Sequence, residues 1–255
     1  DVRYRTHQRY TVDPVDFGQW TLERLVWQGE ERVLDVGCAR GDLLRGLAST
    51  HSGWGALVGF DLSPGMISQA VELAGNLPVH FSVGDAQSLP CPSGSFDVVM
   101  ARHMLYHVPD IDLAIAEGSR LLRPGGQFLI TTNSAYTMPE YHSLSKLAAT
   151  RHPGMNRVEK ATARFSLETA VGFLEPRFDQ VEVHTLSGTL RFPTAQPFLD
   201  YFASGRALIM RPGHTDAQWG QVYDFVRAEV EAIITREGRF DVTKISGAVV
   251  GVKPT

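Results

Sequence analysis

The chain has 255 residues, 43% of them hydrophobic and 20% charged, a composition typical of a globular protein with a sizeable core. Its net charge of −4 gives no cationic field for phosphate backbones, so no nucleic-acid partner is expected. The sequence has no apolar run of about eighteen residues, which argues against a membrane partner, and its two cysteines, Cys38 and Cys91, suggest reduced thiols of a cytoplasmic protein.

Short apolar runs alternate with amphipathic stretches between residues 31 and 132, a rhythm typical of βαβ units on a parallel sheet. Ser63 and Pro64 suit the N-cap and first position of a helix, and Arg123-Pro-Gly-Gly suits the end of another. The pattern predicts strands at 32–36, 56–60, 79–83, 96–101 and 127–132, and helices at 42–50, from 64 onward and at 110–122.

After residue 132 the rhythm changes. Strands are predicted at 180–186 and 242–252, and helices at 140–150, 166–174, 198–204 and 216–236. The expected fold is an open α/β sheet with helical insertions. We expect an N-terminal helical cap at 1–28, an α/β core at 29–132, a lid at 133–165, and the remaining core at 166–255 with a helical insertion before its last strand.

The carboxyl ends of the first three predicted strands carry groups that suit a nucleoside, and ligands of open parallel sheets bind at this edge. The first strand leads into residues 35–41 (DVGCARG), whose small residues let a ligand approach the backbone. Asp61 ends the second strand and suits ribose hydroxyls, and Asp85 follows the third and suits an amino group. Alternatively, 35–41 is an ordinary glycine turn, and Asp61 only favours a helix start.

A nicotinamide-binding domain is the nearest competing interpretation, because it also needs glycines and an acid about twenty residues later. Its fingerprint places a small residue at position 42, where the pyrophosphate rests on a helix N-terminus. Asp42 stands there, and its negative charge would repel a pyrophosphate. A sulfonium nucleoside carries no phosphate, so the sequence favours S-adenosylmethionine over NAD.

Five segments resemble, in order and spacing, the successive motifs of class I S-adenosylmethionine-dependent methyltransferases, above all the small-molecule and quinone-biosynthesis branch. They are VLDVGCARG at 33–41, GFDLSPGM at 59–66, GDAQSLP at 84–90, SFDVVMARHMLYHVPD at 95–110 and LLRPGG at 121–126. The resemblance implies a Rossmann-like α/β sheet with helical lid insertions. It also implies methyl transfer to a small organic acceptor, at an undetermined oxygen, nitrogen or carbon, with S-adenosylhomocysteine as product. Ala39 departs from the family, which usually has a glycine there, and the extra methyl is expected to shift the turn slightly.

By position, the resemblance implies that the turn faces the methionyl part of the cofactor, and that the next strand ends hold its ribose and adenine. The implied cofactor-binding residues are Asp35, Gly37, Cys38, Ala39, Gly41, Asp61, Leu62, Met66, Asp85, Ala86, Ala101 and Arg102. For Arg102, a salt bridge to the cofactor carboxylate and a solvent-facing position are both open.

His103 and His107 are the candidate catalytic residues, and they would share a face if 102–108 were helical. No HExxH pattern or third ligand accompanies them, so no metal is expected. Either could be a general base for a hydroxyl substrate, with His107 preferred, or both could only line the cleft. In-line alignment alone could also support the transfer, because the sulfonium is already a good leaving group.

Aromatic side chains mark the expected acceptor site, although aromatic residues at helical spacing are more often ordinary core. They are Tyr136, Tyr141 and His142 with Met138 in the lid, and Tyr4, Tyr10, Phe17 and Trp20 near the N-terminus. The expected partner is a small-molecule substrate, and the chain is expected to be a monomer or homodimer. A non-catalytic protein of this fold and a nicotinamide-dependent reductase stay open as rival functions.

Overall fold

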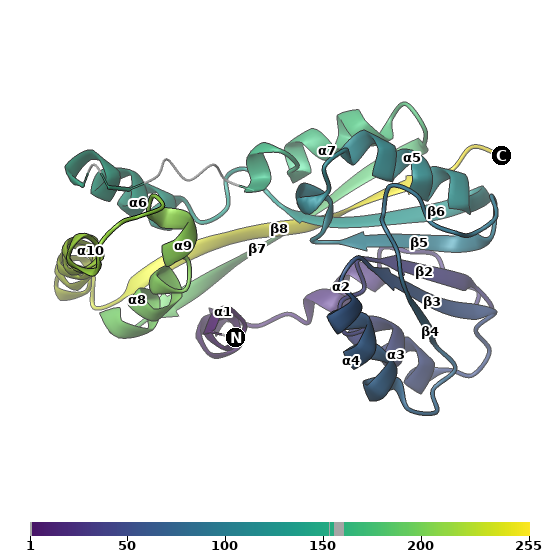
Figure 1. Cartoon of the computed structure of the whole chain (residues 1–255), viewed down its shortest axis with the longest axis horizontal. Helices are drawn as coiled ribbons and strands as arrows, with labels where there is room; N and C mark the ends of the chain where they lie inside the picture. The colour runs from purple at the N-terminus through teal and green to yellow at the C-terminus, as the bar shows by residue number, and fades with distance from the viewer. Residues whose placement is uncertain (1, 153, 156–160) are drawn as a thin grey trace. The chain divides into compact units, whose positions relative to one another are not determined.

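The computed structural model describes residues 2–152, 154–155 and 161–255 (Figure 1). It divides into two compact units. Unit 1 comprises Asp1–Val15, Tyr136–Lys160 and Leu186–Ile245, and unit 2 comprises Asp16–Ala135, Ala161–Thr185 and Ser246–Thr255. Two long strands, β7 (Asp179–Phe192) and β8 (Phe240–Val252), contribute residues to both units.

Unit 2 is built on a mostly parallel sheet. Its strands include β2 (Arg32–Val36), β3 (Ala56–Asp61), β4 (His80–Val83), β5 (Phe96–Arg102) and β6 (Leu122–Asn133). They lie in the order β6-β5-β2-β3-β4 and are parallel, and β8 adds antiparallel to β6. Strands β3 and β4 are added on one side of β2, and strands β5 and β6 are added on its other side. The strand order therefore switches between β2 and β5, and ligands of such sheets bind at the carboxyl ends of the strands beside this switch point.

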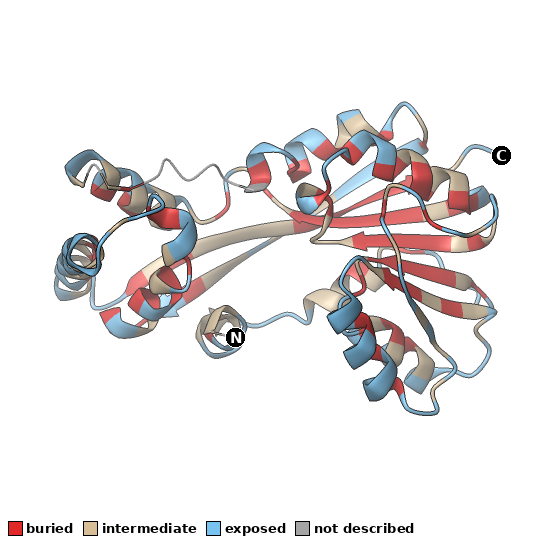
Figure 2. Cartoon of the chain, viewed as in Figure 1, coloured by how far each residue is buried: buried red, intermediate tan, exposed pale blue. Residues whose placement is uncertain are grey.

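Helices cover both faces of this sheet, which is why its central strands are apolar on both sides (Figure 2). On one face, Leu34 and Ile130 pack in a core with Ile115 of α5 (Ile111–Leu121) and Leu174 of α7 (Leu167–Leu174). On the other face, a second core contains residues of the strands together with Leu44 of α3 (Asp42–Thr50). The remaining helices of unit 2 are α2 (Phe17–Leu22), α4 (Pro64–Ala74) and the short 3-10 turns η1 (Leu105–His107) and η2 (Ala161–Ala163).

Unit 1 is largely helical, with α1 (Val2–Tyr10), α6 (Pro139–Arg151), α8 (Ala195–Ala203), α9 (Arg206–Ile209) and α10 (Asp216–Glu237). A short strand, β1 (Thr11–Val12), pairs antiparallel with β7. Its core is aromatic, with Phe192, Phe198, Phe202 and Phe240 all buried. A capping box at Thr215 opens α10. In the described part of the chain, no helix is long and apolar enough to cross a membrane.

The predicted α/β fold is confirmed, and the strand at 32–36 and the helix at 42–50 agree with β2 and α3 at both ends. Residues 102–108, however, do not form a helix. Strand β5 continues to Arg102, His103 takes a left-handed backbone with φ 50°, and only η1 is helical. The strand predicted at 127–132 is longer, because β6 begins at Leu122 and includes the Pro-Gly-Gly segment. The division into cap, core, lid and remaining core stays a prediction.

Candidate functional site

A cavity of about 210 Å³ lies at the carboxyl ends of β2, β5 and β6 in unit 2. It is lined by Phe17, Gly18, Thr21, Gly37, Cys38, Ala39, Asp42, Arg102, His103 and Thr131. Strand ends, the turn after β2 and one face of α2 therefore meet around one space. This is the place where a parallel sheet of this topology is expected to hold a ligand.

The turn after β2 is left-handed at three positions, with φ 71° at Gly37, 48° at Ala39 and 70° at Gly41. A side chain at Gly37 would come within 2.9 Å of Met104, and one at Gly41 would overlap the ring of Phe81. Packing within the protein therefore requires both glycines, in addition to any need for ligand approach. Ala39 keeps the glycine-like conformation at a cost of about 1–2 kcal/mol.

Asp61, at the end of β3, connects this turn to the next strand. Its Oδ2 accepts a hydrogen bond from the backbone N–H of Ala39, and its Oδ1 accepts one from that of Ser63, both at 2.9 Å. Each carboxylate oxygen keeps a second lone pair, so the group can still accept from ribose hydroxyls. Beyond it, Leu62 is 69% exposed and Met66 39% exposed, and such open apolar surface suits a flat base.

Asp85 is exposed in the loop after β4, where its carboxylate accepts hydrogen bonds from the backbone and side-chain amides of Gln87 at 2.9 and 3.0 Å. These bonds hold the pKa of Asp85 below its usual range. Ala86 and Ala101 are buried. Because an alanine side chain has no polar atom, these two residues have only backbone groups to offer a polar ligand.

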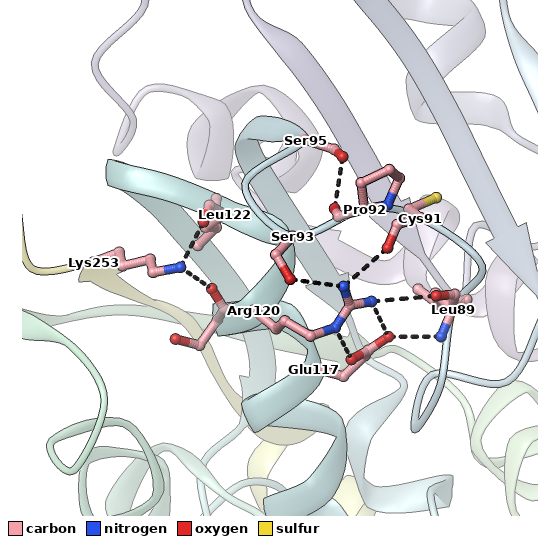
Figure 3. A network of polar contacts seen from close by, with 10 residues as sticks. Leu89, Cys91, Pro92, Ser93, Ser95, Glu117, Arg120, Leu122 and Lys253 are labelled. Carbon is pink, nitrogen blue, oxygen red and sulfur yellow. Dashed lines mark hydrogen bonds and ion pairs between the residues drawn. The ribbon is translucent and has the colours of Figure 1, made fainter.

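An ion pair between the buried Glu117 and the partly exposed Arg120 clamps the loop that carries Asp85 (Figure 3). Glu117 Oε1 accepts from the backbone N–H of Leu89 at 2.7 Å, and both Glu117 oxygens accept from Arg120 at 2.7 Å. Arg120 in turn donates to the carbonyls of Leu89 and Cys91 and to the hydroxyl of Ser93. The last turns of α5 therefore hold the loop in place.

Arg120→Ala is expected to lower the free energy of unfolding by about 1–2 kcal/mol, the usual cost of leaving a buried charged acceptor under-satisfied. The side chain of Arg120 is 37% exposed, so solvent limits the loss. The hydrogen bonds from Arg120 lower the pKa of Glu117, so this stabilisation is present above the unfolded value of about 4.3 and disappears as the pH falls through the lower folded value. Urea unfolding at pH 7 and pH 3 measures it. A loss that is equal at both pH values would contradict the assignment.

Asp35 and Arg102 form an ion pair behind the cavity. Asp35 is 0% exposed, and Arg102 donates to it from Nε at 3.5 Å and from Nη2 at 3.2 Å. Burial raises the pKa of Asp35, while Arg102 opposes the rise. Arg102 also lines the cavity with its side chain 26% exposed, so it neither points simply into solvent nor stands free of a protein partner.

The two candidate histidines lie in different surroundings. His103 lines the cavity, its ring lies 5.5 Å from that of Phe17, and its backbone N–H donates to the Thr131 carbonyl at 2.9 Å. Burial, and to a lesser degree the charge of Arg102, lowers the pKa of His103 to about 4. His107 is exposed, lies edge-on to Tyr106 and is outside the cavity lining. The geometry favours His103, against the preference for His107, and both catalytic roles stay predictions.

Thr131, Gly18 and Thr21 line the cavity but were missed from the sequence. Thr131 is 2% exposed, and within the described residues its Oγ1 has no hydrogen-bond partner. Its place at the end of a predicted strand is the same signal that identified Asp61 and Arg102. None of the recognised motifs reaches the end of this strand, so the sequence gives Thr131 no ligand-binding role.

Asp42 does not stand as the unpaired negative charge that was expected to repel a pyrophosphate. Asp42 is exposed at the start of α3, and it forms ion pairs with Arg40 at 3.3 Å and with Arg45. Two guanidinium groups therefore compensate the negative charge that was expected to repel a pyrophosphate. Asp42 therefore does not discriminate between NAD and S-adenosylmethionine.

Both cysteines carry free thiols. Cys38 lines the cavity, and burial raises the pKa of its thiol to about 12, so the thiol stays protonated and is a poor nucleophile near neutral pH. Among the residues that the structure describes, no three His, Cys, Asp or Glu side chains are grouped so that they could hold a metal ion.

Comparison with known proteins gives consistent matches. A family described as "Methyltransferase domain" matches residues 34–130. The chain is 34% identical over 128 residues to 2-phytyl-1,4-naphtoquinone methyltransferase of Synechococcus elongatus, a match that covers 46% of this chain and 55% of the relative. The chain thus spans about half the length of this relative.

Solved structures match more of the chain. The YcgJ protein of Bacillus subtilis has a TM-score of 0.61 at 21% identity, covering 93% of this chain and 98% of that one. Phosphoethanolamine N-methyltransferase 2 of Haemonchus contortus, solved in complex with S-adenosyl-L-methionine, has a TM-score of 0.56 at 20% identity, covering 93% and 52%. At these identities the likeness concerns the fold.

Proposed function

We propose that this chain, whose residues 34–130 form a methyltransferase domain of class I fold, transfers a methyl group from S-adenosylmethionine to a small organic molecule. The observation that carries the proposal is the hydrogen bond by which Asp61 at the end of β3 holds Ala39 in the left-handed turn at 37–41, a residue that lines the cavity. The turn lets a ligand approach its backbone closely, and Asp61 offers acceptor oxygens. Leu62 and Met66, which follow Asp61 in the chain, expose apolar surface.

These groups fit the parts of the cofactor. Asp61 would hold the ribose hydroxyls, and the loop at Asp85 would receive the amino edge of the adenine. The turn and Arg102 would face the amino-acid end. When bound, the cofactor supplies an electrophilic methyl group on a positively charged sulfur. None of the residues facing this space is required to form a covalent intermediate.

The acceptor side of the cavity is partly aromatic. Phe17 of α2 lies 5.5 Å from the ring of His103, with the two ring planes tilted by 37°, so both rings contribute aromatic surface to the cavity wall. The match with a naphthoquinone methyltransferase supports a planar organic acceptor for this chain as well. Methyl transfer then depends mainly on alignment, with His103 placed to accept a proton from an acceptor hydroxyl.

Calorimetric titration with S-adenosylhomocysteine tests the proposal. We expect the wild-type chain to bind it, and Asp61→Ala to lose about 1.5–3 kcal/mol of binding free energy, the usual value for hydrogen bonds to a charged group. Asp61→Asn, which keeps one acceptor oxygen, should lose less. NAD(H) and NADP(H) are the comparison ligands, and the proposal requires that S-adenosylhomocysteine raise the melting temperature more than either of them does.

Stabilisation by a nicotinamide cofactor alone would contradict the proposal and favour the reductase. A screen of product masses over hydroxyl, amine and carbon-acid acceptors then tests catalysis itself. If the chain binds S-adenosylhomocysteine but methylates none of these acceptors, the result favours a non-catalytic protein of this fold.

A further inference from the structure

The loop between β5 and α5, residues 103–110, begins with an uncommon backbone conformation. His103 lies in the left-handed region with φ 50°, although it carries a side chain. Such a conformation persists where the surrounding structure holds it in place. At this end of the loop, the His103 N–H donates to the Thr131 carbonyl. Met104 packs against the turn at Gly37, where an added Cβ would lie 2.9 Å from it.

The other end of the loop leaves backbone carbonyls without a local donor. The short turn η1 is followed by Pro109, which has no N–H, so the Tyr106 carbonyl cannot accept from the residue three positions ahead. The N–H of Asp110, four positions ahead, donates to Gln87 Oε1 at 3.1 Å instead. Donors for the last carbonyls of this loop therefore come from solvent or from another element.

Arg164, which lies between η2 and α7, supplies such donors. Its Nη1 donates to the Tyr106 carbonyl at 3.2 Å, and its Nη2 donates to those of Val108 and Pro109 at 2.8 and 2.9 Å. A guanidinium is a rigid fork, so its outer nitrogens bridge carbonyls that are separated along the chain. Arg164 is exposed, and solvent weakens each bond, but all three act on one short segment.

We propose that Arg164 is a positioning residue for the methyl transfer, because it fixes the carbonyls of 106–109 and thereby keeps His103 at the cavity wall. This assignment rests on the proposed function. Leu105 and Val108 bury the loop in the core, but apolar contacts are non-directional, whereas hydrogen bonds from a rigid fork fix its orientation. Arg164 is not among the described residues that line the cavity, so it acts through the loop.

Arg164→Met tests this assignment, because methionine keeps much of the side-chain length and removes every donor. NMR titration of the His103 ring, whose signals are assigned by their loss in His103→Gln, reports where the ring lies. Burial holds the pKa of His103 at about 4 in the wild type. In the variant a released loop exposes the ring, so this pKa should rise toward its ordinary value. The protonated fraction at pH 5 should then increase about fivefold, as for a rise of about one pH unit.

Activity provides a second measurement. With an acceptor identified by the product-mass screen, kcat of Arg164→Met should fall about tenfold through misplacement of His103, while affinity for S-adenosylhomocysteine stays within about twofold. Arg164→Lys keeps the charge but not the fork, so it should show a smaller change in both the His103 titration and kcat. Urea unfolding checks that both variants fold, and if Arg164→Met does not, Arg164→Lys carries the test.

Arg177→Met is the matched control. Arg177 donates to the two carboxylate oxygens of Asp112 on α5 at 3.0 and 2.8 Å. Its replacement therefore also removes a partly exposed guanidinium that contacts α5, but leaves the hydrogen bonds to the loop carbonyls in place. The His103 titration and kcat should match those of the wild type.

An unchanged His103 titration in Arg164→Met, or the same change in Arg177→Met, would overturn the assignment while leaving the proposed function intact. A changed titration with unchanged kcat would overturn it as well, since Arg164 would then hold the loop without serving the transfer. If the wild-type chain does not bind S-adenosylhomocysteine, the proposed function fails, and the positioning role fails with it.

Discussion

Arg102→Ala is expected to lower the free energy of unfolding by about 3–5 kcal/mol at pH 8, the range for breaking a buried ion pair by removing one partner. Asp35 has no exposed surface, and both of its carboxylate oxygens accept from Arg102. Without the guanidinium, the carboxylate stays buried with its main compensating charge gone. The side chain of Arg102 is 26% exposed, which places the expected value at the lower end of this range.

The loss should depend on pH in a defined direction. Burial already raises the folded pKa of Asp35 above the unfolded value of about 3.9, so this carboxyl costs stability once the pH rises above that value. In Arg102→Ala the folded pKa rises further, because the opposing charge is gone. The difference from wild type is therefore largest at neutral and alkaline pH. It decreases as the pH falls from the higher folded pKa of the variant to the lower one of the wild type, below which Asp35 is protonated in both folded proteins.

A double-mutant cycle separates the ion pair from simple loss of packing. Asp35→Asn with Arg102→Met removes both charges and keeps much of the volume, so it should recover most of the lost stability. Urea unfolding of the two single variants and the double variant at pH 8 and pH 5 measures the coupling. A loss below 1 kcal/mol in Arg102→Ala, or one that grows on acidification, would contradict a buried charged pair.

The fold of unit 2 was predictable because its signals are local. Alternating apolar runs and a Ser63-Pro64 helix start are set by neighbours in sequence, and the structure places β2, α3 and α4 where these signals put them. The end of β5 was not predictable in the same way. His103 takes a left-handed backbone that no local preference demands, and its N–H bonds to Thr131 on another strand.

Side-chain pairing was the less predictable part of the site. The pattern placed Asp35 and Arg102 at strand ends but left open what Arg102 contacts, because register between β2 and β5 is a property of the folded sheet. The same holds for Asp42, whose pairing with Arg45 one helical turn later cancels the charge argued from the sequence. Thr131 can be assigned to the cavity only from the folded structure, because the sequence does not show whether a hydroxyl has a hydrogen-bond partner.

His103→Gln is expected to lower kcat by about 10², the lower end of the usual contribution of a general base, if the acceptor is a hydroxyl compound, because the lowered pKa of His103 makes it a weak base. Glutamine keeps a hydrogen-bonding group at the cavity wall but does not take up the proton at neutral pH. His107→Gln is the matched control, because His107 is exposed and outside the cavity lining, and it should lose less than tenfold. Affinity for S-adenosylhomocysteine should stay within about twofold in both variants.

The pH profile of the wild-type enzyme adds an independent test of His103. An unperturbed histidine becomes protonated below about 6.5, whereas burial holds the pKa of His103 at about 4. A base with this lowered pKa stays neutral as the pH falls, so kcat should be level from pH 8 to about 5 and fall only as the pH approaches 4. The acceptor identified by the product-mass screen and mass-spectrometric detection of its methylated product supply the measurement. A decline centred near 6.5, or a loss below tenfold in His103→Gln, would mean that alignment alone or another base supports the transfer.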